Sequence, residues 1–143
     1  MARVNTYLNF PGNTEAAFAF YEQVFGTTIT SLTRMKDMPR PEGAPVLTDE
    51  QGELIMNVQL PITAGHVLMA TDAVESLGQH LKVGNNVTIG LDLDSHEEAE
   101  LIYNQLLDGS PENSGPLAQM PWGALWGSCE DKFGTRWMIS ADL

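Results

Sequence analysis

Hydrophobic and polar positions follow the same order twice along this chain of 143 residues. Val4 to Gly26 reads as a short alternating strand, a turn and a one-sided apolar helix, and Val87 to Gly109 repeats that order. A shift of 82 residues, the separation of Tyr21 from Tyr103, aligns the two helices. The aligned positions have the i, i+3, i+4, i+7 spacing of an amphipathic helix, with Ala17, Phe20, Tyr21 and Val24 on Ala99, Ile102, Tyr103 and Leu106.

The strands that precede these helices align one residue out of step. Val4, Leu8 and Phe10 fall on Val87, Leu91 and Leu93, a shift of 83 residues, and one extra residue in the first turn accounts for the difference. Two copies of one module in a small domain usually form their functional site where the copies meet. The repeat therefore predicts where to look for a site.

The first module reads as β-α-β-β-β. A strand Arg3–Phe10 leads through a Pro-Gly-Asn turn into a helix Thr14–Phe25, which Asn13 or Thr14 caps and Gly26 ends. β-branched and turn residues then predict a strand, a proline-rich loop and a hairpin, at Thr27–Arg34, Met35–Asp49, and Leu54–Leu60 with His66–Thr71. A linker Asp72–Asn85 follows, with a helical turn near Val74–Leu81.

The second module repeats this order. A strand Asn86–Asp94 precedes a helix that opens with a capping box of Ser95 and Glu98 and runs to about Leu107. Three more strands are predicted at Pro116–Met120, Ala124–Cys129 and Thr135–Ser140. The fold class is α+β: one domain, 1–143, whose modules 1–72 and 86–143 can form a curled, concave eight-stranded mixed sheet with the helices outside.

The composition disfavours some classes of binding partner. Nineteen acidic residues against seven basic ones give a net charge of −12, which disfavours binding to nucleic acid or to an anionic membrane. No apolar run approaches the roughly 20 residues of a membrane helix, and the first residues lack a signal-peptide pattern, so a cytoplasmic location is expected. Cys129 is the one cysteine, and without a neighbouring His it is not expected to be a nucleophile.

Several stretches together resemble a known family. They are Tyr7-Leu8-Asn9-Phe10, Ala17 to Tyr21, Val24-Phe25-Gly26 and Asp131-Lys132-Phe133-Gly134-Thr135-Arg136-Trp137-Met138-Ile139. With the duplication, they resemble the PhnB-like branch of the vicinal oxygen chelate superfamily, which contains glyoxalase I, extradiol dioxygenases and the fosfomycin and bleomycin resistance proteins. The resemblance spans essentially the whole chain. It implies the concave-sheet fold and a homodimer.

The resemblance also implies where a metal would bind. In metal-dependent members, each module supplies one ligand from its opening strand and one from its closing strand, typically His, Gln or Glu. Those places correspond to Asn5 and Thr88 on the opening strands, and to Met69 and Met138 on the closing strands. An amide, a hydroxyl and two thioethers do not form a Zn²⁺, Mg²⁺ or Mn²⁺ site, so neither a metal nor another cofactor is expected.

Strand alternation predicts a mixed ligand pocket instead. Its polar side comprises Asn5, Tyr7, Asn9, Thr88 and Asp92, and its apolar side Met69 and Met138. Of Trp122, Trp126 and Trp137, at least one is expected in the core, and Trp126 is a candidate for the pocket. Asp92 could act as a general base, hold a cationic group, or be an ordinary exposed carboxylate at a strand end. Alternation does not decide whether Ser128 or Cys129 faces inward.

Three functions remain open. The first is a metal-independent protein that binds an unidentified small molecule, with no catalytic residue assigned. The second is a divergent metal-dependent lyase, dioxygenase or thiol transferase that recruits His66, Glu53 or Asp92. The third is drug sequestration, in which an acidic dimer binds a bulky cationic compound, as the charge of −12 suggests.

Overall fold

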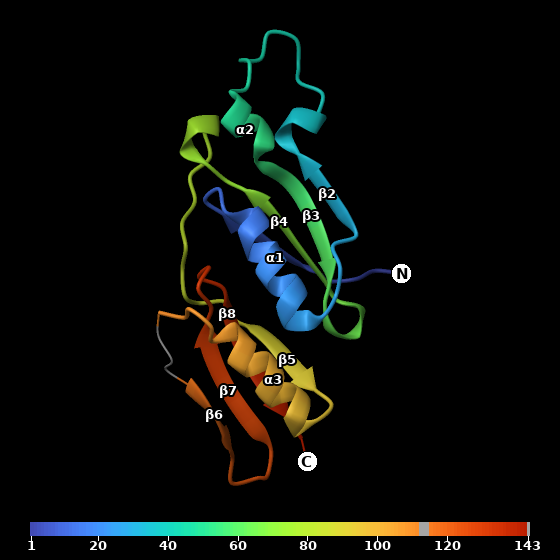
Figure 1. Cartoon of the computed structure of the whole chain (residues 1–143), viewed down its shortest axis with the longest axis vertical. Coiled ribbons are helices and arrows are strands. Elements are labelled where there is room, and N and C mark those ends of the chain that lie inside the picture. Colours follow the sequence, from blue (N-terminus) through green and yellow to red (C-terminus); the bar gives the residue numbers. More distant parts are fainter. Residues whose placement is uncertain (112–114, 143) are drawn as a thin grey trace. The chain divides into compact units, whose positions relative to one another are not determined.

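The computed structural model describes residues 1–111 and 115–142, which belong to two compact units, Met1–Lys82 and Val83–Leu143. Each unit holds one four-stranded sheet that mixes parallel and antiparallel strands (Figure 1). The predicted α+β class and the two tandem modules are confirmed. Over the described residues, no helix combines the length and the apolar character needed to cross a membrane.

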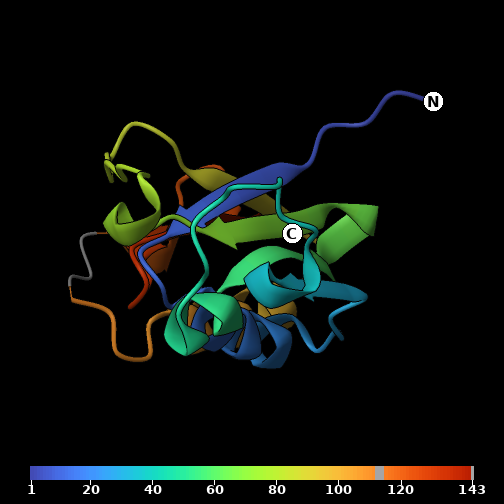
Figure 2. The same ribbon diagram turned by 90° about the horizontal axis from the view of Figure 1, so that it is seen from above.

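The sheet of the first unit has the strand order β1-β4-β3-β2. β1 (Thr6–Phe10) runs parallel to β4 (Val67–Asp72), whereas β3 (Ile55–Pro61) is antiparallel to both β4 and β2 (Ser31–Arg34). The helix α1 (Thr14–Phe25) has the predicted bounds and packs on one face of this sheet (Figure 2). No helix of this unit, all of whose residues are described, packs on the other face.

The second unit repeats the topology in the order β5-β8-β7-β6. Here β5 (Ile89–Leu93) runs parallel to β8 (Arg136–Ala141), and β7 (Leu125–Glu130) is antiparallel to β8 and β6 (Gly115–Gln119). The helix α3 (His96–Leu106) contacts β5, β7 and β8. Both units therefore have one helix-covered face and one open face.

Several elements differ from the sequence prediction. β1, β2 and β5 begin three or four residues late, so that Asn5 and Thr88 lie just before their strands. The predicted loop Met35–Asp49 starts with a 3₁₀ turn, η1 (Met35–Asp37), and ends where the short helix α2 (Asp49–Glu53) begins. A capping box, with Thr48 and Gln51 hydrogen-bonded to each other's backbone, explains α2. The linker turn is shorter than predicted, η3 (Glu75–Leu77), and η2 (Thr63–Gly65) joins β3 to β4.

The predicted apolar helix faces form the two cores. Ala17, Phe20, Tyr21 and Val24 are buried on α1, and Ala99, Ile102, Tyr103 and Leu106 are buried on α3. Gly26 ends α1 in the left-handed conformation (φ 64°), and its N–H donates to the carbonyl of Glu22 at 2.9 Å. The shared periodicity of the two helices therefore reflects shared packing.

The N-terminus of α1 is closed by a residue from another strand. Asn13 occupies the N-cap position, one of the two predicted alternatives, but its side chain makes no cap hydrogen bond, and Thr14 is itself a donor. Asp72, buried at the end of β4, accepts from the backbone N–H of Thr14 at 3.0 Å and from its hydroxyl at 2.6 Å. Its second oxygen accepts from the N–H of Ile55 at 2.8 Å. One carboxylate therefore joins α1, β3 and β4.

In the second unit, the N-terminus of the helix is capped by the residue directly before it. Ser95 caps α3 by accepting from the N–H of Glu98 at 3.1 Å, as predicted. Ala141 pairs with Leu93 as Asp72 pairs with Phe10, so the position of the bridging carboxylate is occupied by Ala141. The second unit has its own buried carboxylate at Asp131, which fixes the turn between β7 and β8 by accepting from the N–H groups of Phe133 and Thr135.

Replacing Asp72 with Ala should destabilise the protein by about 3 kcal/mol or more, because two backbone N–H groups and a hydroxyl lose their buried acceptor. Asp72→Asn should cost less, since its carbonyl oxygen can still accept from Thr14. Urea unfolding measures both changes in the free energy of unfolding. Asp142→Ala, which removes an exposed carboxylate near the C-terminus, is the control and should stay within about 0.5 kcal/mol. Equal effects at the two positions would contradict this role for Asp72.

Candidate functional site

The open face of the first sheet presents a row of side chains across all four strands. Tyr7 on β1 lies beside Met69 on β4, which lies beside Gln59 on β3, which in turn pairs with Ser31 on β2. Strand alternation explains the face, because Leu68 and Ala70 on either side of Met69 are fully buried on the helix side. Tyr7 is 48% exposed, so an aromatic ring and a thioether lie accessible next to amide and hydroxyl groups.

Two asparagines continue this face along β1. Asn9 pairs with Thr71 on β4 and is exposed. Asn5, half-buried just before β1, has its amide oxygen engaged by the backbone N–H of Val67 at 3.2 Å. Asn5 therefore has a structural partner already, whereas Asn9 is accessible to a ligand.

The open face of the second sheet has three rows, one of which is the ion pair of Glu130 and Arg136 at its far end. The other two rows consist of uncharged and acidic residues. In one, Asp92 on β5 lies beside Ser140 on β8, which lies beside Trp126 on β7. The Ser140 hydroxyl donates to the Asp92 carboxylate at 2.6 Å. In the other, Met138 on β8 lies between Gly90 and Ser128. A Cβ at Gly90 would meet the Met138 methyl at 3.2 Å, so the glycine leaves room for this side chain.

The open faces of the two units have equivalent strand positions. Met69 and Met138 occupy equivalent places on the central strands, since they pair with Tyr7 and Gly90, which are 83 residues apart. Asn9 corresponds in the same way to Asp92. The two faces therefore share a central thioether and differ at the edge strand, where one has Tyr and Asn and the other Gly and Asp.

The eight residues predicted for the pocket fall into two groups. Tyr7, Asn9 and Met69 share the open face of the first unit, with Asn5 at its margin. Asp92, Trp126 and Met138 share the open face of the second unit, and Thr88 is exposed just before β5. Gln59, Ser31 and Ser140 belong to the same rows but were not predicted, although strand alternation also reaches them. Ser128, which alternation had left open against Cys129, belongs to these rows as well.

A separate cleft of about 680 Å³ lies in the first unit, at the start of α1. Pro11, Asn13, Leu54 and Val74 line it together with Thr48 and Gln51, which are already bonded within their capping box. None of the predicted pocket residues lines this cleft. No residue pattern predicted this cleft, because it forms between the β1–α1 turn, α2 and η3.

Comparison with known proteins agrees with this architecture. A model of the glyoxalase/bleomycin resistance protein/dioxygenase superfamily matches residues 3–139. The chain belongs to this superfamily. Protein YjdN of Escherichia coli strain K12 is 28% identical in an alignment that covers 96% of this chain and 93% of YjdN.

Solved structures extend the similarity over nearly the whole chain. Protein PA1353 from Pseudomonas aeruginosa is 29% identical, with a TM-score of 0.83 over 99% of this chain and 98% of that one. A Bacillus cereus protein described as a putative 3-demethylubiquinone-9 3-methyltransferase, PhnB protein, is 20% identical, with a TM-score of 0.74 over 98% and 99% of the two chains. The PhnB protein's fold agrees with the predicted PhnB-like branch of the superfamily.

The donor set at the positions where the resemblance implies metal ligands does not fit a divalent ion. The Asn5 oxygen is taken by Val67, Thr88 offers one hydroxyl, and Met69 and Met138 offer thioethers, which are poor ligands for Zn²⁺, Mg²⁺ or Mn²⁺. Within residues 1–111 and 115–142, no three His, Cys, Asp or Glu side chains gather as a metal site would require.

The alternative ligands in the first unit do not come together either. Glu53 precedes β3 and His66 follows it, so the length of the strand, roughly 20 Å, separates them. The His66 Nε2 lies 2.8 Å from the Thr6 hydroxyl. A common metal ion at His66 and Glu53 is therefore ruled out by the sheet itself.

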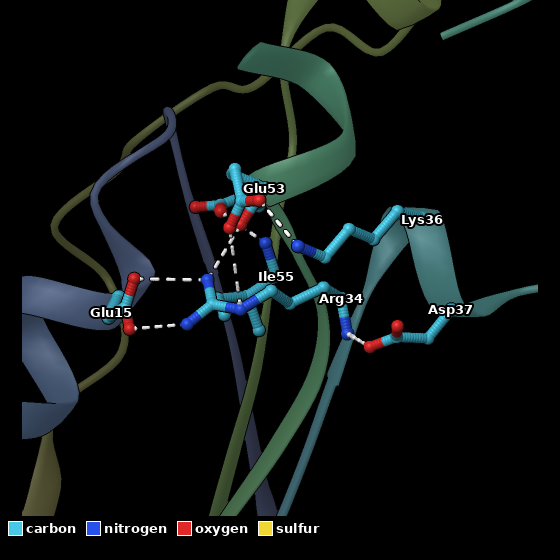
Figure 3. A network of polar contacts seen from close by, with 7 residues as sticks. Glu15, Arg34, Lys36, Asp37, Glu53 and Ile55 are labelled. Atoms are coloured by element: carbon cyan, nitrogen blue, oxygen red, sulfur yellow. Dashed lines mark hydrogen bonds and ion pairs between the residues drawn. The ribbon is translucent and has the colours of Figure 1, made fainter. Parts of the chain in front are cut away.

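Glu53 instead belongs to a network of ion pairs centred on Arg34 (Figure 3). Arg34 makes a two-pronged contact with Glu15 at 2.6 and 3.1 Å and donates to the Glu53 carbonyl at 2.8 Å, while Lys36 pairs with the Glu53 carboxylate at 2.5 Å. The hydrogen bonds to Arg34 lower the pKa of Glu15 and raise the pKa of Arg34. This network connects α1, β2 and α2.

The tryptophans and the cysteine divide between core and surface. Trp137 is fully buried and donates its indole N–H to Asp131 at 2.8 Å, Trp122 is 73% exposed in the β6–β7 turn, and Trp126 is half-buried on the open face. Ser128 points to the open face and Cys129 to the helix side. Burial and the nearby Asp131 raise the pKa of the Cys129 thiol to about 11, so it is protonated at neutral pH.

Cys129 should therefore react slowly with iodoacetamide in the folded protein. Because the folded pKa is about 11, above the ordinary value of a thiol, the stability gained from burying the neutral group is complete at neutral pH and is lost as the pH rises toward 11. The alkylation rate should show no inflection between pH 7 and 9, whereas the urea-unfolded chain should titrate near pH 8.5. An inflection near neutral pH in the folded protein would contradict this assignment.

Proposed function

We propose that this chain is a metal-independent protein that binds a small molecule on the open faces of its sheets. The observation that carries the proposal is the pair of methionines, Met69 and Met138, at equivalent places on the central strands. The family resemblance implies ligand positions there for the metal-dependent members. Thioethers are polarisable and flexible, so they pack against irregular organic ligands rather than hold a hard cation.

The neighbours of the methionines support an organic ligand. On the first face, the half-exposed Tyr7 ring lies on one side of Met69 and the Gln59 amide on the other. On the second, Met138 is flanked by the Ser128 hydroxyl, with Trp126 in the next row. Apolar and aromatic groups interspersed with a few hydrogen-bonding groups are the usual lining of small-molecule sites.

Metal independence can be tested directly by calorimetry. Zn²⁺, Ni²⁺, Mn²⁺ and Mg²⁺ are titrated separately into chain that has been treated with a chelator and then dialysed. We expect no saturable one-to-one binding of submicromolar affinity, because the donor positions offer an engaged amide, a hydroxyl and two thioethers. A submicromolar site that His66→Ala, Glu53→Ala or Asp92→Ala abolishes would instead support the divergent metalloenzyme.

The position of the ligand can be tested by mapping small uncharged fragments with ¹H–¹⁵N spectra. Fragments that bind should shift the amide signals of β1, β4, β5, β7 and β8, with Met69 and Met138 at the centre of the affected residues. Replacing Met138 with Ala should weaken fragments that bind to the second face by about fivefold, since a buried contact of a few methylene groups is lost. Met38→Ala, at a solvent-exposed position outside both sheets, is the matched control.

Fragments that shift only the cleft around Asn13 and Val74, or only the exposed surfaces of α1 and α3, would overturn the proposed location. The same spectra report whether each variant remains folded, so a loss of binding by unfolding is recognised.

A further inference from the structure

Asp92 presents a carboxylate on the open face of the second sheet, and none of the basic side chains described in that unit pairs with it. One of its carboxylate oxygens accepts the hydroxyl of Ser140, which is neutral. Residues 83–143 contain only two basic side chains, Lys132 and Arg136, against ten acidic ones. In the described structure Lys132 lies 4.0 Å from Asp108 and Arg136 lies 3.8 Å from Glu130, so both basic groups are next to other carboxylates.

The aromatic ring nearest along the same row is Trp126. Asp92, Ser140 and Trp126 occupy directly paired positions on three adjacent strands. Strands in a sheet are spaced about 4.8 Å apart, so the α-carbons of Asp92 and Trp126 are roughly 10 Å apart with Ser140 between them. A small organic ion laid along this row can therefore approach the carboxylate and the indole at once.

This combination favours a positive charge. A carboxylate attracts a cation by Coulomb interaction, and the face of an indole ring attracts it through the ring quadrupole. Met138, in the adjoining row, offers an apolar thioether for the uncharged part of the ligand, with the space over Gly90 beside it.

The first unit provides the contrasting case. At the position equivalent to Asp92 it has Asn9, and its main row of Tyr7, Met69, Gln59 and Ser31 is uncharged. The chain thus contains a charged and a neutral version of the same strand position. Its own repeat indicates that Asp92→Asn is compatible with the fold.

We propose that the open face of the second sheet binds the cationic end of a small organic molecule, a primary or quaternary ammonium group, through Asp92 and Trp126. This inference rests on the proposed function, because it names the chemical class of ligand for one of the two open faces. The carboxylate and the face of the Trp126 indole hold the ammonium group, Ser140 fixes the carboxylate, and Met138 contacts the uncharged part of the ligand.

A pair of probes that differ only in charge tests the inference. 2-Phenylethylammonium chloride and 2-phenylethanol are titrated into ¹⁵N-labelled protein at pH 7, and the indole N–H signal of Trp126 is followed after assignment with Trp126→Phe. We expect the ammonium probe to bind at least about fivefold more tightly than the alcohol and to shift the signals of Asp92, Ser140 and Trp126.

Matched variants identify the groups responsible. Asp92→Asn should abolish the preference for the ammonium probe, whereas Asp94→Asn, which removes an exposed carboxylate just beyond the same strand, should leave it unchanged. Trp126→Leu should weaken the ammonium probe, and Trp122→Leu, which removes the exposed indole in the β6–β7 turn, should not. Spectra of the free variants establish that each is folded.

The outcomes separate this inference from the proposed function. Equal affinity for the two probes, or an unchanged preference in Asp92→Asn, overturns the cation site while leaving small-molecule binding on the open faces intact. Binding of neither probe to the second face also overturns it. The proposed function is judged independently, by the uncharged fragments and the metal titrations.

Discussion

The first unit depends on one buried carboxylate. Asp72 lies at the end of β4 and accepts hydrogen bonds from the first turn of α1 and from the first residue of β3. Elements far apart in the sequence are thereby fixed at a single point, and the orphan N–H groups of a helix start and a strand start are satisfied together. Because α1 is held against one side of the sheet, the opposite side, with Tyr7 and Met69, remains open.

The two modules reach the same topology by different local chemistry. In the second module, Ser95 lies directly before α3 and caps it, and Ala141 occupies the position equivalent to Asp72. The second module instead concentrates its buried polar contacts at Asp131, which organises a hairpin turn and holds the Trp137 indole. A repeat can therefore conserve which faces are buried while exchanging the polar contacts that stabilise them.

Sequence periodicity predicted what depends on burial. The bounds of α1, both apolar helix faces and the strand alternation that separates Met69 and Met138 from the core follow directly from residue patterns. The first residues of the strands were harder to predict. The residues before β2, for example, are β-branched and yet are not part of the strand. The helix α2 rests on a capping box within a proline-rich loop, and the role of Asp72 requires contacts across 58 residues, which no local pattern encodes.

The sulfur-containing side chains differ in their exposure to oxidants. The thiol of Cys129 is buried and protonated, which makes it a poor target for peroxides, whereas Met69 and Met138 are half-exposed. Conversion of either thioether to a sulfoxide would replace a soft apolar contact by a strong hydrogen-bond acceptor in the middle of an open face. Oxidative damage would thus alter the open faces of the sheets before it reached the core, and methionine sulfoxide reductases rather than thiol reductants would be needed to reverse it.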